Sequence, residues 1–138
     1  MKIVSWNCNG KFREKYTEMV KLCADIYVIE ECEDPSQCSA SGYRAFSENY
    51  LWIGERPSKG LGIFANRSIK LSKKDWPNFR LRNFLPVNVN NYFNLLCVWA
   101  CKPYIEEYCV YQAIHKDKYT PNMVIIGDFN SNKIWDRG

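Results

Sequence analysis

The sequence predicts an α/β fold in which a mixed β-sheet carries helices on one face. Three observations lead to this fold class. The apolar stretches 2–7 and 25–30 flank a helical pattern at 11–23, and a strand–helix–strand unit of this kind makes its two strands parallel. Short strand-like runs follow in the middle of the chain, and a second helix with a final apolar strand comes after them.

The first helix is expected over 11–23, after a turn at Asn9 and Gly10. Its apolar residues recur at helical spacing: Phe12, Tyr16, Met19, Val20 and Cys23. A stripe of this kind packs against a sheet. Because strand 25–30 is then parallel to strand 2–7, Asn7 and Glu31 are expected at the same edge.

Short strands are predicted in the middle of the chain because apolar runs alternate there with Gly, Asn, Ser and Pro. Their expected ranges are 43–47, 50–54, 61–65 and 68–72, arranged as an antiparallel meander. Gly60 and Gly62 bracket Leu61, a pattern that indicates a bulge or a close backbone approach.

Two more strands, a helix and a final strand complete the predicted order. The strands are expected at 84–89 and 92–99, the helix at 104–118 and the last strand at 123–127. The helix follows Pro103, has acidic residues in its first turn and ends in lysines, in agreement with the helix dipole.

Polar side chains follow three of the predicted buried strands. Asn7 ends the first, Glu31 the second, and Asp128 and Asn130 the last. An isolated Asp-x-Asn is more often a turn or a helix cap than a site. Ligands of open α/β sheets bind outside the strand ends, however, and Mg²⁺ prefers carboxylate oxygens with substrate phosphate, so three such ends favour a site.

Four segments in this order resemble the endonuclease/exonuclease/phosphatase superfamily, which includes AP endonucleases, DNase I-like nucleases and inositol-phosphate phosphatases. The segments are Ser5-Trp6-Asn7-Cys8-Asn9-Gly10, Val28-Ile29-Glu30-Glu31, Gly60-Leu61-Gly62-Ile63-Phe64 and Ile126-Gly127-Asp128-Phe129-Asn130-Ser131-Asn132. The resemblance extends from residue 2 to 137. It implies a DNase I-like four-layer α/β sandwich, of which residues 1–138 would be a single, truncated domain holding only the first half and the first sheet.

The resemblance also implies hydrolysis of phosphoesters with Mg²⁺ or Mn²⁺. Glu31 is then the direct metal ligand, with Asn7 and Asp128 beside the metal, and Glu30 fills a position that more often holds Gln. Asp128 would polarise the attacking water, and Asn130 would hold the water or the phosphate in line. Tyr104 is a possible match for the family's phenol, and Trp135-Asp136-Arg137 is expected to brace the active-site loop.

One family feature is missing from the sequence, namely a C-terminal Asp–His pair that contacts the scissile phosphate. The single histidine, His115, is expected to have a surface or capping role. We therefore expect residues 1–138 to be a weakly active or inactive fragment. Its exposed apolar sheet face would pair with a missing C-terminal half or drive self-association.

Basic residues in the middle third suit a polyanionic substrate, and Lys73, Lys74 and Arg80 are the candidates to bind it. The expected partner is nucleic acid or another phosphoester. A phosphomonoesterase acting on sugar or inositol phosphates remains an alternative within the enzyme class. A non-catalytic binding module that keeps the fold is an alternative outside it.

Composition excludes several other classes. A chain of 138 residues with 46% apolar content can form a buried core, and no apolar run approaches the about 20 residues that a membrane helix needs. No signal peptide precedes the first strand, so a cytosolic protein with mostly buried, reduced cysteines is expected. Cys97 and Cys101 lie four residues apart on a strand, about 13 Å, which excludes a shared zinc ion.

Overall fold

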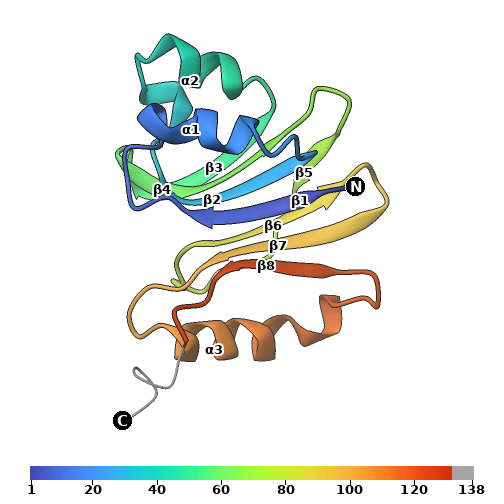
Figure 1. Cartoon of the computed structure of the whole chain (residues 1–138). Coiled ribbons are helices and arrows are strands. Elements are labelled where there is room, and N and C mark those ends of the chain that lie inside the picture. Colours follow the sequence, from blue (N-terminus) through green and yellow to red (C-terminus); the bar gives the residue numbers. More distant parts are fainter. Residues whose placement is uncertain (132–138) are drawn as a thin grey trace.

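The computed structural model describes residues 1–131 and shows two four-stranded sheets packed face to face. Helices α1 (Phe12–Val20) and α2 (Ser41–Phe46) cover the outer face of the first sheet, and α3 (Ile105–His115) covers the outer face of the second (Figure 1). The short 3-10 helices η1 (Pro35–Gln37) and η2 (Lys116–Lys118) complete the helical segments. The predicted α/β class with a mixed sheet and helices on one face is confirmed for each sheet.

The first sheet has the strand order β1-β2-β4-β3. Its strands are β1 (Ile3–Asn7), β2 (Ile26–Cys32), β3 (Tyr50–Arg56) and β4 (Lys59–Ala65). β1 and β2 are parallel, as expected for strands joined through a helix, whereas β4 is antiparallel to both of its neighbours. Asn7 is in register with Glu30, which confirms that β1 and β2 end at the same edge.

The second sheet has the order β5-β6-β7-β8 and repeats this plan. Its strands are β5 (Leu71–Lys73), β6 (Phe84–Val89), β7 (Phe93–Trp99) and β8 (Val124–Asp128). β7 and β8 are parallel and are joined through α3, and the other pairs are antiparallel. Trp99 pairs with Asp128, so β7 and β8 also end at one edge.

The second sheet corrects the expectation that this chain holds only the first. Strands β6 and β7 do not extend the β1–β4 sheet. They belong to a second sheet that packs on the first, and their inward side chains form a core between the two sheets. This core includes Ile26, Val28, Leu61, Ile63, Leu85, Val87, Leu95 and Cys97. The apolar face predicted to be exposed is therefore buried against β5–β8.

Two of the predicted short strands are also wrong. Residues 43–47 fall largely in α2, because Tyr43 and Phe46 both pack on the Phe12 ring, at 5.5 and 5.8 Å between centroids. Residues three apart share a helical face but would lie on opposite faces of a strand. The strand predicted at 68–72 is shorter, at Leu71–Lys73, and it joins β6 instead of continuing the meander.

Among the described residues, no helix is long and apolar enough to cross a bilayer.

Candidate active site

Three polar side chains from both sheets converge where their strands end. Asn7 closes β1, Glu31 lies near the end of β2, and Asp128 closes β8. The Asn7 amide nitrogen donates to Asp128 Oδ2 at 2.7 Å and to Glu31 Oε1 at 3.4 Å. The structure thus brings together three of the residues predicted from strand ends, with Asn7 between two carboxylates.

A β-bulge sets the direction of Glu31. The pairing of β2 with β4 shifts between Glu30 and Cys32, and Glu31 has a φ of 67°, in the left-handed region that a non-glycine residue rarely adopts. Gly60 opposes Cys32 in this register, and a side chain at Gly60 would lie 2.3 Å from Ile53 O. The close approach predicted around Gly60 is therefore confirmed.

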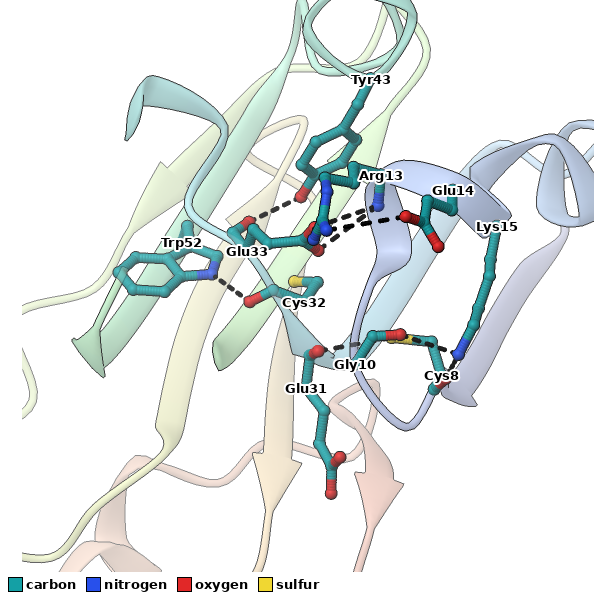
Figure 2. Close-up of polar contacts among 10 residues, drawn as sticks. All are labelled: Cys8, Gly10, Arg13, Glu14, Lys15, Glu31, Cys32, Glu33, Tyr43 and Trp52. Carbon is teal, nitrogen blue, oxygen red and sulfur yellow. Dashed lines mark hydrogen bonds and ion pairs between the residues drawn. The ribbon is translucent and has the colours of Figure 1, made fainter. Parts of the chain in front are cut away.

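Neighbouring groups hold the backbone of this bulge (Figure 2). The Cys8 thiol lies 3.4 Å from Glu31 O, and Trp52 Nε1 donates to Cys32 O at 3.1 Å. Burial raises the pKa of Cys8 to about 11, so it stays a neutral thiol that can donate. The Glu31 carboxylate points away from these contacts (Figure 2), and its Oε1 accepts from the Asn7 amide nitrogen.

A second group of contacts holds the turn after β1 and the residue that follows β2. Lys15 Nζ donates to the carbonyls of Cys8 and Gly10 at 2.7 and 2.8 Å, which holds the turn after β1. Arg13 pairs with Glu33 at 2.8 Å, and Tyr43 donates to Glu33 O at 2.7 Å (Figure 2). The supporting shell is therefore built largely by α1 and α2.

Asp128 takes part both in a turn and in the cluster with Asn7 and Glu31. Its Oδ1 accepts from Asn130 N at 3.0 Å, the turn that a lone Asp-x-Asn would predict, while Oδ2 accepts from Asn7. The Asn130 side chain donates to Ala100 O at 2.8 Å and so ties the loop after β8 to the end of β7. In this structure Asn130 positions Asp128.

Glu30 is fully buried at the end of the inter-sheet core. Ser5 Oγ donates to its Oε1 at 2.8 Å, and no hydrogen bond from the described residues reaches its Oε2. Burial, with a smaller contribution from the nearby Asp128 charge, raises the pKa of Glu30 to about 7 despite the Ser5 hydrogen bond. Its carboxyl is therefore close to half-protonated near neutral pH.

Lys59 lies beside the Glu31 carboxylate. Lys59 Nζ lies 3.2 Å from Glu31 Oε2, close enough for an ion pair, although no hydrogen bond to this oxygen is formed within residues 1–131. Sequence reasoning missed Lys59, because nothing at the start of β4 indicates that its side chain reaches Glu31 on β2. Ser5 was missed because its partner, Glu30, lies 25 positions away on another strand.

The donor set fits a hard divalent cation. Glu31 and Asp128 supply two carboxylates, and Mg²⁺ is usually held by one or two carboxylates with waters and substrate phosphates. The Asn7 amide nitrogen lies between these carboxylates, while its Oδ1 accepts from Asn9 N at 3.0 Å. The described residues contain no group of three or more His, Cys, Asp or Glu suited to a metal.

The remaining predicted site residues lie elsewhere. Tyr104 precedes α3, and no hydrogen bond joins it to Asn7, Glu31 or Asp128 in the part of the chain described. Lys73, Lys74 and Arg80 line one cavity of about 460 Å³ between the end of β3 and the segment 73–86. Trp135-Asp136-Arg137 lies outside the described residues.

His115 is buried, which corrects the expected surface or capping role. Its Nε2 donates to Pro77 O at 2.7 Å, and its Nδ1 accepts from Lys118 at 3.2 Å, because a carbonyl only accepts and an ammonium only donates. The Trp76 ring packs on the imidazole at 5.6 Å. His115 thus anchors the loop after β5.

Comparison with solved structures identifies the fold. The chain is similar to the 3'-5' exonuclease NExo from Neisseria meningitidis, with a TM-score of 0.66, 19% identity, and 94% of this chain and 58% of that chain covered. It is also similar to a humanized D. rerio TDP2 (TM-score 0.65, 16% identity, 98% and 64% covered). An AP endonuclease from Archaeoglobus fulgidus gives a TM-score of 0.67 at 12% identity, with 94% and 57% covered.

These likenesses confirm the DNase I-like fold that the sequence motifs indicated. The chain spans about three fifths of the length of these structures, as the covered shares of 58%, 64% and 57% show. No family model and no curated protein sequence matches it.

Proposed function

We propose that this chain carries the site of a divalent-metal-dependent phosphodiester hydrolase that acts on nucleic acid. The observation that carries the proposal is the bridge from the Asn7 amide to Glu31 and Asp128 at the ends of three strands. The fold adds support, because its neighbours include nucleases and a phosphatase. Among them are NExo with a product DNA hairpin and D. rerio TDP2 with single strand DNA product.

Each residue has a role that its position supports. Glu31 and Asp128, with Asn7, would hold Mg²⁺ or Mn²⁺, and such an ion supplies Lewis-acid stabilisation of charge on the phosphoryl oxygens. The Asp128 carboxylate accepts a proton from the attacking water as the water oxygen bonds to phosphorus and the P–O bond to the leaving group breaks. Asn7 and Asn130 hold the Asp128 carboxylate in place through its two oxygens.

We expect turnover to be slow. The only histidine of residues 1–138, His115, is buried against Pro77 and Trp76, so it does not supply the phosphate-contacting imidazole that the family resemblance implies. Loss of one preorganised transition-state donor typically lowers the rate by about 10²–10³. Only three of the seven cysteines, Cys8, Cys32 and Cys97, are buried, which corrects the expectation that most of them are.

The test compares hydrolysis of bis(p-nitrophenyl) phosphate, a small diester, with hydrolysis of p-nitrophenyl phosphate, a monoester, in Mn²⁺ and in EDTA. We expect Mn²⁺-dependent cleavage of the diester that Asp128→Asn and Glu31→Gln abolish. Glu18→Gln is the matched control, because Glu18 is an exposed carboxylate on α1. Faster cleavage of the monoester would favour the phosphomonoesterase, and no metal-dependent turnover would favour a binding module.

A further inference from the structure

A basic path leads away from the candidate centre along one side of the sandwich. It begins at a cavity of about 150 Å³ whose lining includes Lys59 and Trp99. Lys59 is the residue that pairs with Glu31, and Trp99 is in register with Asp128. This first cavity therefore adjoins the centre through both sheets.

The path continues into the larger cavity of about 460 Å³. Both cavities share Glu55, Arg82 and Asn83 in their linings, so they are neighbours with a common wall. Arg82 is held at this junction, since it donates to Lys102 O at 3.1 Å and lies 3.7 Å from Glu55. Its side chain is still 40% exposed, which leaves donors available to a ligand.

Positive charge is concentrated along this path. The two linings contain six cationic side chains and one carboxylate, a formal net of +5, whereas the whole chain carries +4. The cations are Arg56, Lys59, Lys73, Lys74, Arg80 and Arg82. A substrate with one phosphate occupies one end of such a path, whereas a chain of phosphates neutralises all of it.

The loop 74–83 adds an aromatic side chain to this basic wall. Phe79 lies between Asn78 and Arg80, which both line the larger cavity, and it is 64% exposed. Phe79 and Arg80 both have left-handed backbone, with φ of 49° and 69°, a conformation that only a well-supported loop maintains. The support comes from Pro77 and Trp76, which are fixed on His115.

We propose that this path binds a single-stranded polynucleotide, with its phosphates on the cations from Lys59 to Lys73 and a base stacked on Phe79. Unpaired bases expose the faces that an aromatic ring needs for stacking, whereas a duplex hides them. The proposal rests on the proposed function, because it assigns the strand beyond the reacting phosphate of that same site.

The test measures binding without turnover. A fluorescein-labelled single strand of about 12 nucleotides and the matching duplex are titrated with the chain in EDTA, and anisotropy is followed at several salt concentrations. We expect Lys73→Gln/Lys74→Gln to weaken single-strand binding about tenfold and to reduce the log–log salt slope by about 1.4. We expect Phe79→Ala to weaken it about tenfold.

Matched controls separate this path from general charge and general aromatic exposure. Lys11→Gln/Lys21→Gln removes two exposed cations from the α1 side, and Tyr92→Ala removes a ring that is 78% exposed in the turn before β7. Neither should change binding by more than about twofold. Equal losses in the controls, tighter binding of the duplex, or no binding by the unaltered chain would overturn the proposal.

The two proposals fail separately. If Asp128→Asn leaves hydrolysis of the small diester unchanged, the assignment of the reaction centre is wrong, while the EDTA titrations still decide on the strand path. If diester hydrolysis depends on Asp128 but Phe79→Ala binds like the Tyr92→Ala control, only the path is wrong.

Discussion

Glu30 and Glu31 are adjacent carboxylates with opposite environments. The bulge in β2 leaves Glu30 in the inter-sheet core and directs Glu31 to the edge, where its side chain is 17% exposed and lies beside Lys59. The Glu30 carboxyl is therefore about half-protonated near neutral pH, while Glu31 pairs with a cation. A single extra residue in one strand is enough to separate a structural acid from a candidate ligand.

The buried acid makes stability depend on pH. The pKa of Glu30 is about 7 in the folded chain against an ordinary value of 4.5, so the folded state keeps a proton that the unfolded chain releases. The free energy of unfolding should fall as the pH rises from 4.5 to about 7 and then stay level with respect to this group. Glu30→Gln keeps the acceptor for Ser5 and removes this loss, so at pH 8 it should be about 3 kcal/mol more stable.

Urea unfolding at several pH values measures this effect as the difference between the variant and the unaltered chain. Glu18→Gln serves as the control, because that carboxylate is 59% exposed on α1. If the free energy of unfolding changed with pH in the same way in Glu30→Gln and in the unaltered chain, that result would contradict a raised pKa of Glu30.

Lys59 competes with a cation for Glu31. The ammonium lies 3.2 Å from the carboxylate but is 50% exposed, so solvent and salt weaken its effect. Lys59→Gln should tighten Mn²⁺ binding about two- to fivefold at low ionic strength, and the gain should shrink as KCl is added. Calorimetric titration measures both, with Lys21→Gln as the control. Weaker Mn²⁺ binding in Lys59→Gln would show that the lysine assists the site.

At the scale of elements, the contact of β8 with β7 depends on Gly127. It pairs with Val98, has a φ of 148°, and a β-carbon on it would lie 1.9 Å from Val98 O. Gly127→Ala must push β8 away from β7 and should lower the free energy of unfolding by about 3 kcal/mol or more. Gly10→Ala is the control, because Gly10 also has a positive φ but nothing within 4 Å of the added carbon, and about 1 kcal/mol is expected there.

Urea unfolding followed by tryptophan fluorescence compares the two variants. Equal losses in Gly127→Ala and Gly10→Ala would mean that the close approach to Val98 does not limit the strand pair.

Local sequence patterns predicted where the strands end better than which strands pair with one another. The apolar runs before Asn7 and Asp128 identified β1 and β8, but these two residues are 121 positions apart and belong to different sheets. An apolar run has the same pattern whichever sheet it joins, so the sequence did not reveal that β6 and β7 form a second layer. The bulge at Glu31 was hidden for a similar reason, because it exists only relative to β4.

At the scale of the whole molecule, each sheet combines a parallel β–α–β pair with antiparallel strands. β1 and β8 are each an edge strand of their sheet, and they contact each other across the sandwich. Within residues 1–131, neither pairs with another strand on its outer side. In the part of the chain that the structure describes, the β1 and β8 edges are therefore open on the same side, next to the ends that carry Asn7 and Asp128.

Open edges of this kind promote association, because unpaired backbone groups can bond to another strand. We expect the chain to self-associate with increasing concentration in sedimentation velocity. Val124, which is 37% exposed at the start of β8, marks one edge, and Val124→Lys should weaken association about tenfold by placing a charge there. Leu22→Lys is the matched control, since Leu22 is 39% exposed but lies in the turn after α1. A monomer at every concentration, or equal effects of the two lysines, would show that these edges do not mediate association.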